Sequence, residues 1–228
     1  MLRRRGLNLA RMMMLMGGRG ASAPIPWYLS GGIPAANCIA AYQPIGAASL
    51  ALSYVNLANP GTYDATAPTA APDHSTAEGW IFDSASSEYL STGVPVNLMV
   101  GDGSLIIKYT DFTAGGYFVG ASGCVLRKFI GTYSRYSNGG TNLQIDVAPN
   151  LLGTSAVAGN KAYRDGIAEP GDIPSGVISE IYPIFVNTYN NLGSPATFCT
   201  YKVQALAIYD ITLTPAKVLA VHNAMEGL

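Results

Sequence analysis

Short apolar runs separated by turn residues make up most of the chain after Gly79. GWIFDSASSEYLSTGV, GSLIIKYTDF and EIYPIFVNTYNN are examples, and Gly, Asn or Ser punctuates most of them. Trp80 and Phe82 are two residues apart, so they share one face of a strand. Arg164-Asp165-Gly166 predicts a hairpin turn, because Asp-Gly accepts positive φ. Short strands with regular turns favour an all-β sandwich or barrel.

The last residues of the chain carry the clearest helical pattern. Thr214 is a typical N-cap and Pro215 suits the first helical position, while Gly227 provides a stop. The apolar positions fall on one face at i, i+3 and i+7, namely Val218, Val221 and Met225. We expect this short helix to cover one end or edge of the sandwich, where strand groups are exposed.

The region before Gly79 is more hydrophobic and less regular. NCIAAYQPIGAASLALSYVNLA predicts a strand and a short Ala-rich helix, Asn59-Pro60-Gly61 predicts a turn, and 64–78 reads as a surface loop. A chain of 228 residues fits one all-β domain. We therefore predict an arm at 1–26 and a sandwich domain at 27–228, with a lead-in at 27–78 and a core at 79–228.

Residues 1–26 differ from the rest of the chain in charge. They hold five arginines and no acid, which gives this segment a charge of +5. The remainder holds 8 basic and 14 acidic residues and has a charge of -6. The segment imitates a signal peptide, but Arg11 interrupts its apolar run and Arg19 follows it. No run approaches the ~18 apolar residues of a membrane span. We interpret it as an assembly arm with an apolar side and a basic side: Arg3, Arg4, Arg5, Leu9, Met12, Met13 and Leu15. Nucleic acid, a membrane or an acidic protein could be its partner, and a disordered tail is the alternative.

Composition narrows the class of protein only slightly. Charged residues make up 12% of the chain, against roughly 25% in typical domains. Such a surface suits packing into a larger assembly, and it also suits secretion. Cys38, Cys124 and Cys199 are far apart and form no CxxC pair, so zinc is disfavoured and buried free thiols are expected. A Cys38–Cys199 disulfide is the alternative to free thiols.

Three stretches in order resemble laminin-G-like, concanavalin A-like jelly-roll domains. GWIFDSASSEYLSTGV is similar to their opening strand pair, KAYRDGIAEPG to their hairpin, and YKVQALAIYDITLTPAKVLAVHNAM to their closing strand and terminal helix. AAYQPIGAASLALSYVNLANPGTYDA resembles the lead-in beside such domains in phage and prophage structural proteins. The resemblance implies a jelly-roll sandwich that serves in binding or assembly. Many such domains bind glycans, and others belong to phage fibres or capsid decoration proteins.

Few residues in the chain suggest catalysis. Related jelly-roll domains that cleave glycans carry paired carboxylates on one strand, in an ExDxxE pattern. Here Glu180 and Asp146 each stand alone, without a second acid at that spacing. His74 and His222 have no GxSxG-like motif near them and are expected at the surface. Asp102 and Asp165 are the acids available for a calcium site of the laminin-G kind, and turn formation is the favoured interpretation. We therefore expect no enzyme, no metal and no cofactor.

GTYSRYSNGG at 131–140 is the best sugar-binding candidate. Tyr133 and Tyr136 would stack on sugar faces, while Arg135 and Asn138 would bind hydroxyls. An ordinary loop at one end of a sandwich would carry the same residue types. NTYNNLGSP at 187–195 is a second loop of this kind.

Two functional hypotheses follow. The first is a non-enzymatic virion structural protein, which docks on other virion proteins through its arm, forms a homo-oligomer (a trimer is favoured) and binds a host-surface glycan. The second is a secreted or cell-surface lectin-like module, located outside the cell, whose mature chain starts near Ala23 or Pro24. A glycan-cleaving enzyme is a third interpretation with less support, because the sequence shows no acid pair.

Overall fold

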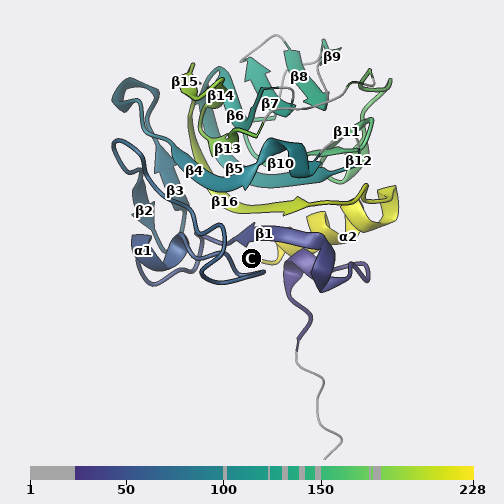
Figure 1. Ribbon diagram of the computed structural model, residues 1–228, viewed down its shortest axis with the longest axis horizontal. Coiled ribbons are helices and arrows are strands. Elements are labelled where there is room, and N and C mark those ends of the chain that lie inside the picture. The colour runs from purple at the N-terminus through teal and green to yellow at the C-terminus, as the bar shows by residue number, and fades with distance from the viewer. Residues whose placement is uncertain are drawn as a thin grey trace, which may run out of the picture.

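The computed structural model describes residues 24–99, 102–122, 124–129, 133–138, 142–146, 150–174, 176 and 181–228. Within them, two eight-stranded sheets pack face to face (Figure 1). An all-β sandwich, as predicted, is the architecture of the described chain. Glu180 lies outside the described residues, and so do the predicted arm residues Arg3, Arg4, Arg5, Leu9, Met12, Met13 and Leu15.

Sheet A combines strands from both halves of the chain. Its central strand β16 pairs with β5 along one edge, and with β3 and then β1 along the other. The spatial order is β12 (Ile167–Ala168), β11 (Lys161–Arg164), β10 (Gly153–Ala158), β5 (Ser104–Ala114), β16 (Thr200–Tyr209), β3 (Gly79–Phe82) and β2 (Asp73–Ser75), with β1 (Cys38–Tyr42) beside β16. The predicted lead-in thus supplies two strands of this sheet.

Sheet B lies above sheet A in the view of Figure 1. Most of its neighbouring strands are antiparallel, and β14 runs parallel to β6. The order is β15 (Ser194–Ala196), β14 (Tyr189–Asn191), β6 (Gly116–Ala121), β7 (Cys124–Phe129), β8 (Tyr133–Asn138) and β9 (Asn142–Ile145), while β13 (Pro183–Val186) pairs with both β6 and β4 (Leu90–Pro95).

Helical segments are short apart from the last one. They are α1 (Leu50–Ser53), α2 (Pro215–Glu226) and the 3-10 turns η2 (Trp27–Leu29), η3 (Ala35–Asn37), η4 (Ser84–Ser86) and η5 (Val96–Met99). The predicted start of α2 is confirmed, because the Thr214 hydroxyl accepts a hydrogen bond from the Lys217 amide and Pro215 opens the helix. Gly227 is the C-cap, also as predicted.

The main core fills the space between the two sheets. Trp80 and Phe82 both point into it, as their spacing predicted. The Phe118 ring stacks on Tyr201 with centroids 4.5 Å apart, and the Tyr201 hydroxyl donates to the Phe118 carbonyl oxygen. These contacts join β6 of sheet B to β16 of sheet A, so aromatic burial holds the sandwich together.

A second apolar cluster lies on the outer face of sheet A. There Val218, Val221 and Met225 of α2 are buried against sheet residues such as Ile106 and Ala207. The prediction that the last helix covers an end or edge of the sandwich is therefore wrong. The helix packs on a sheet face, because the strands beneath it present apolar side chains outward and need a cover.

Two further sequence predictions are confirmed. Asp165 and Gly166, with φ values of 49° and 75°, form the two-residue turn between β11 and β12. Cys38, Cys124 and Cys199 are buried free thiols, so the Cys38–Cys199 bridge is not formed. Burial raises the pKa of the Cys38 and Cys124 thiols to about 12. Among the described helices, none combines the length and the apolar character that crossing a membrane requires.

Candidate functional site

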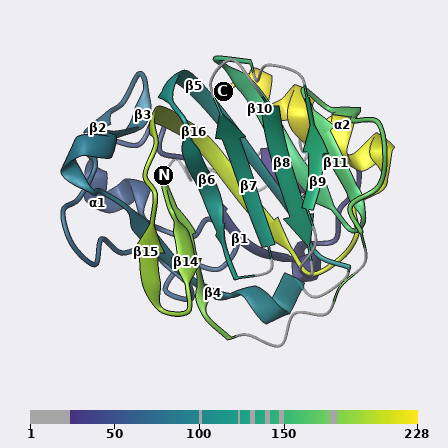
Figure 2. The ribbon, with the colours of Figure 1, turned by 90° about the horizontal axis from the view of Figure 1, so that it is seen from above.

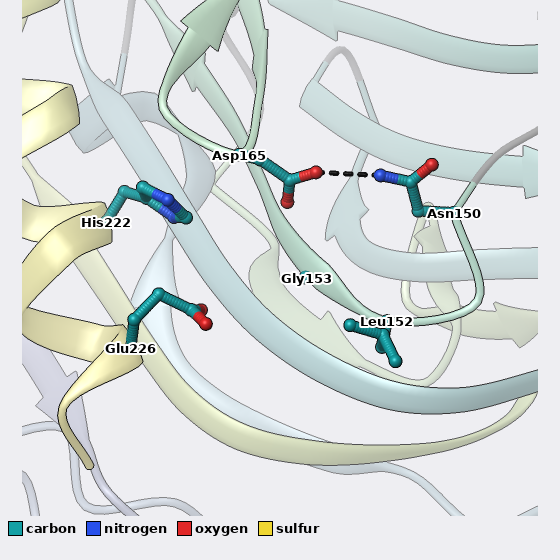
Figure 3. Close-up of a pocket in the computed structure, with 6 residues that line it drawn as sticks. All are labelled: Asn150, Leu152, Gly153, Asp165, His222 and Glu226. Carbon is teal, nitrogen blue, oxygen red and sulfur yellow. Dashed lines mark hydrogen bonds between the residues drawn. The ribbon is translucent and has the colours of Figure 1, made fainter.

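A pocket of about 250 Å³ lies where α2 meets the start of β10 and the β11–β12 turn (Figure 3). Its polar groups come from three separate elements, and one leucine adds an apolar surface. We call it the α2 pocket; the residues that line it are Asn150, Leu152, Gly153, Asp165, His222 and Glu226.

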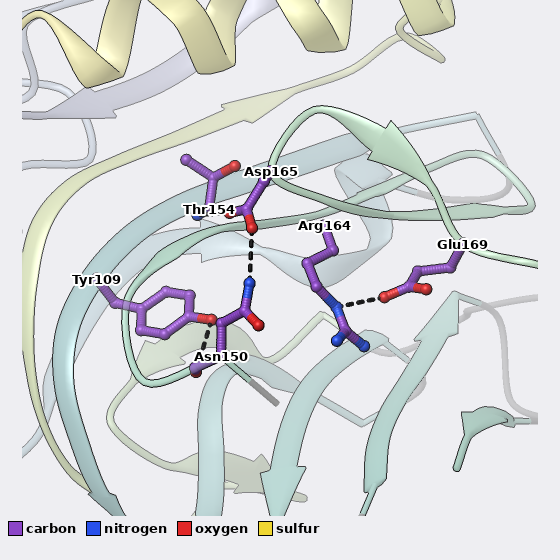
Figure 4. Close-up of polar contacts among 6 residues, drawn as sticks. All are labelled: Tyr109, Asn150, Thr154, Arg164, Asp165 and Glu169. Carbon is purple, nitrogen blue, oxygen red and sulfur yellow. Dashed lines mark hydrogen bonds and ion pairs between the residues drawn. The ribbon is translucent and has the colours of Figure 1, made fainter. Parts of the chain in front are cut away.

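The hairpin turn fixes the Asp165 carboxylate. Its Oδ1 accepts a hydrogen bond from the Thr154 amide at 2.8 Å, and its Oδ2 accepts one from the Asn150 side-chain amide at 2.7 Å (Figure 4). The Tyr109 hydroxyl also donates to the Asn150 backbone oxygen at 3.2 Å. Three contacts therefore hold Asn150 and Asp165 in place before any ligand arrives.

Two glycines permit the close packing around this carboxylate. Gly153 has φ +124°, and a Cβ atom there would collide with Asp165 Oδ1. A Cβ atom on Gly166 would press against Leu219 and His222 of α2. Because glycine lacks a Cβ atom and tolerates positive φ, the turn can sit directly on the helix.

The helix contributes an imidazole and a second carboxylate. His222 Nδ1 lies 3.0 Å from the Thr154 hydroxyl, and Glu226 follows one turn later with its side chain 48% exposed. Lys108 lies beneath them, nearly buried, and donates to the Met225 carbonyl oxygen at 2.7 Å. Its ammonium is 3.7 Å from Glu226 Oε1. The cation thus stabilises the carbonyl end of the helix and offsets part of the Glu226 charge, while Asp165 and Glu226 both line the pocket.

On the inner side of sheet A, the same hairpin contributes an ion pair. Arg164 Nε lies 2.6 Å from Glu169 Oε1, and both side chains are largely buried (Figure 4). Burial raises the pKa of the neighbouring Tyr136 hydroxyl to about 12. Buried, paired polar groups of this kind order the hairpin that carries Asp165.

The pocket has the residue types that recognise polar, ring-shaped ligands. Carboxylate and amide oxygens accept hydrogen bonds from hydroxyl groups. Leu152, with 62% of its surface exposed, offers an apolar side next to them. A few convergent polar groups with apolar surface typify small-molecule sites. Among the described residues, no cluster of three or more His, Cys, Asp or Glu residues could hold a metal ion.

The sequence-predicted sugar-binding stretch is a strand for most of its described length. Tyr133–Asn138 form β8, between β7 and β9 of sheet B, so the interpretation of this part as an end loop is wrong. Tyr136 is 1% exposed and belongs to the core, and Asn138 is buried and donates to the Gly159 carbonyl oxygen. The structure therefore separates the four candidates onto two faces. Tyr133 and Arg135 lie on the outer face, where the glycan-binding prediction still applies to them.

The second loop candidate is also structured. Residues 189–191 and 194–196 form the β14–β15 hairpin, with Leu192 and Gly193 at positive φ in its turn. The sequence also assigned His222 to an ordinary surface position and Asp165 to a turn. Both line the α2 pocket, and the four-residue spacing of His222 and Glu226 on a helix was the available signal.

A second groove, of about 360 Å³, is lined by residues of β3, β5 and β16. Lys202 is its charged centre and forms ion pairs with Glu78 and Asp111. Because two acids of the chain already pair with this ammonium, it is less available to a ligand.

The fold has counterparts among solved structures. A mutant of Trypanosoma rangeli sialidase with trans-sialidase activity superposes with a TM-score of 0.61 and 14% identity, over 84% of this chain and 34% of that one. Trypanosoma rangeli sialidase in complex with the inhibitor DANA gives 0.62 and 14%, over 89% and 35%. The complex with sialic acid gives 0.59 and 12%, over 90% and 35%. The chain thus spans about a third of the length of these sialidases.

No protein-family model matches the chain, and no curated protein matches its sequence. The expectation that the chain is not an enzyme is contradicted by this comparison, because sialidases, which are enzymes, are among the solved structures that share its fold. At this level of identity the likeness establishes the fold alone, and it does not assign the activity of the sialidases to this chain.

Proposed function

We propose that this β-sandwich is a carbohydrate-binding, lectin-like domain and that the α2 pocket holds one sugar unit. The observation that carries the proposal is the convergence of Asn150, Asp165, His222 and Glu226, from three elements, beside the exposed Leu152. The shared fold with sialidases supports a glycan ligand. The jelly-roll, laminin-G-like class suggested by the sequence belongs to this proposal as well.

The charges of the pocket select the kind of sugar. Asp165 and Glu226 bring two carboxylates, and the Lys108 ammonium, 3.7 Å from Glu226 Oε1, balances one of them, so one net negative charge is left. An anionic sugar would be repelled at such short range. We therefore expect a neutral sugar, whose hydroxyl groups donate to the carboxylates and to the Asn150 amide oxygen.

Titration of the isotope-labelled protein with methyl glycosides of galactose, mannose, glucose and N-acetylglucosamine tests the proposal. At least one should shift the amide resonances of residues 150–154, 165 and 222–226. Glu226→Gln removes a charged acceptor, which contributes about 1.5–3 kcal/mol per hydrogen bond, so affinity should fall roughly tenfold or more. Asp172→Asn also removes one carboxylate, at a 59% exposed side chain outside the pocket, and should bind like the wild type.

Shifts confined to another surface, or equal binding by Glu226→Gln, would refute the pocket assignment. Hydrolysis is a second candidate function, because the pocket carries two carboxylates and glycoside hydrolysis uses such a pair. Release of p-nitrophenol from aryl glycosides of the same sugars, lost in Glu226→Gln and kept in Asp172→Asn, would support it. Binding without release would leave the lectin-like function alone.

The place of the protein in biology is proposed from the sequence. A phage virion component that docks through residues 1–26 and forms a trimer is the first proposal, and a secreted or cell-surface module is the alternative. Intact mass and sedimentation separate them. A chain that keeps its first residues and sediments as a trimer supports the first, whereas a monomer that starts near Ala23 or Pro24 supports the second.

A further inference from the structure

Two consecutive leucines lie at the edge of the α2 pocket. Leu151 is 59% exposed and Leu152 is 62% exposed, although leucine is among the residues that are most often buried. Leu152 lines the pocket itself, and Figure 3 shows it across the pocket from His222 and Glu226. We call Leu151 and Leu152 the leucine rim. The described chain thus leaves an apolar surface uncovered directly beside the proposed sugar site.

Backbone contacts hold the leucine rim in place. The Leu151 carbonyl oxygen accepts a hydrogen bond from the Phe112 amide at 3.0 Å. The preceding carbonyl oxygen, of Asn150, accepts one from the Tyr109 hydroxyl at 3.2 Å, and Gly153 after the rim begins β10. Because the loop is attached at both ends, a ligand that covered the leucines would lose little binding energy to ordering it.

The size of the α2 pocket limits what can lie inside it. Its volume of about 250 Å³ is below the roughly 300–1,000 Å³ of pockets that enclose drug-sized ligands. We therefore expect one sugar unit to fill it, and any group attached to that sugar has to leave over the edge of the pocket. On the helix side this edge carries the half-exposed carboxylate of Glu226, and on the opposite side it carries the leucine rim.

The chemistry of the leucine rim selects the attached group. A second sugar would need hydrogen-bond partners, and leucine side chains have no donor and no acceptor. A hydrocarbon chain has no such need, and its contact with the leucines removes apolar surface of both partners from water. Each methylene group that becomes fully buried raises affinity about fourfold. The rim therefore favours a hydrocarbon over a second sugar.

We propose that the α2 pocket recognises a glycoside with a hydrocarbon aglycone. The neutral sugar occupies the pocket, and the first methylene groups of the chain lie on Leu151 and Leu152. This proposal rests on the proposed sugar site and adds the class of ligand that the site takes. Free alkyl glycosides and the glycolipids of a membrane share this chemistry.

Calorimetry of the full chain with the methyl and octyl β-glycosides of galactose, mannose, glucose and N-acetylglucosamine tests the proposal, with each octyl glycoside below its micelle concentration. For a sugar that binds, the octyl glycoside should bind about tenfold or more tightly than the methyl glycoside, because burial of two methylene groups gives this factor. Its change in heat capacity should also be more negative, since burial of apolar surface has this signature.

Leu151→Ser removes apolar surface from the rim and leaves every residue that lines the pocket unchanged. It should lower the affinity for the octyl glycoside about fivefold and keep the affinity for the methyl glycoside, which also shows that the variant is folded. Leu192→Ser is the matched control, because Leu192 is 60% exposed in the turn of the β14–β15 hairpin, far from α2 (Figure 2). It should bind both glycosides like the wild type.

Phosphatidylcholine vesicles with and without galactosylceramide or glucosylceramide separate the two sources of such a ligand. Flotation with the glycolipid vesicles alone, lost in Leu151→Ser, would assign the site to a membrane glycolipid. Binding of the monomeric octyl glycosides without flotation would assign it to a free glycoside, and both results support the shared chemistry. Equal flotation with vesicles that lack glycolipid would overturn the proposal in favour of a general apolar patch.

Two calorimetric results would overturn the proposal and leave the α2 pocket as a sugar site. They are equal affinity for the methyl and octyl glycosides, and an unchanged affinity for the octyl glycoside in Leu151→Ser. Binding of no glycoside at all would refute the sugar site together with this proposal, so the two failures give different results.

Discussion

The two outer faces of the sandwich differ in whether another part of the chain covers them. Sheet A directs aliphatic side chains such as Ile106, Ala156 and Ala207 outward, and η2 and α2 cover them. Sheet B directs Tyr133 and Gln144 outward, and no described helix covers it. A face that is apolar needs part of the chain as its cover, while a polar and aromatic face can meet solvent or a ligand directly.

This difference also explains where the α2 pocket arises. The cover is incomplete at the end of α2, where His222 and Glu226 extend past the buried Val221 and Met225 toward the β11–β12 turn. The pocket is the gap left between a helix and the sheet that it covers. On sheet B, by contrast, any site must be a flat surface, because no described element rises beside it.

Disruption of the covered face should produce the largest effect. Val221→Asp would place a carboxylate among apolar side chains, where an unpaired charge is very unfavourable. We expect a loss of about 4 kcal/mol or more in the free energy of unfolding, measured by urea denaturation. Asn223→Asp puts the same carboxylate on the exposed side of the same helix and should change stability by less than about 0.5 kcal/mol. Similar losses in both variants would show that α2 is not a buried cover.

The turn beneath the pocket should be the next most sensitive point. Gly153→Ala combines positive φ with a collision at Asp165 Oδ1, so we expect it to cost about 3 kcal/mol and to abolish sugar binding. Gly61→Ala also has positive φ but has open space around the added atom, and it should cost only about 1 kcal/mol. Thermal unfolding measures both costs, once the shift in melting temperature is converted into a free energy of unfolding through the unfolding enthalpy. Equal costs would mean that the collision with Asp165 does not occur.

Alkaline pH should lower the free energy of unfolding by a smaller amount. Burial raises the pKa of Tyr136 to about 12 in the folded state, from about 10 when unfolded. The unfolded chain loses this proton first, so stability should fall by about 1.4 kcal/mol per pH unit between these two values. In Tyr136→Phe that contribution disappears and the fall, followed by urea denaturation across this range, should be shallower. An unchanged slope would place the Tyr136 hydroxyl in contact with water.

Local signals in the sequence were sufficient for some elements. Thr214-Pro215 fixed the start of α2, and Asp165-Gly166 fixed a turn, because in both cases the cause lies within a few neighbouring residues. The 131–140 stretch misled for a physical reason. In β8 tyrosine occupies both faces, with Tyr133 outward and Tyr136 inward, so the alternation of apolar and polar residues that marks a strand is absent.

The candidate sites depend on tertiary structure and could not be read from neighbouring residues. The α2 pocket joins residues 150–165 to residues 222–226, and only the packing of α2 on sheet A brings them together. The register between β7 and β8 is likewise set by tertiary structure, and the sequence does not display it. The resemblance to lectin-like jelly rolls suggested a binding module, and the fold was needed to locate where it could bind.

The most direct test of the central proposal is the binding of the wild type and Glu226→Gln to an array of immobilised neutral oligosaccharides, with Asp172→Asn as the matched control. We predict that the wild type and Asp172→Asn bind the same class of neutral sugar and that Glu226→Gln loses it. Binding that is equal in all three proteins, or absent from every neutral sugar, would contradict the assignment of the α2 pocket as a carbohydrate site.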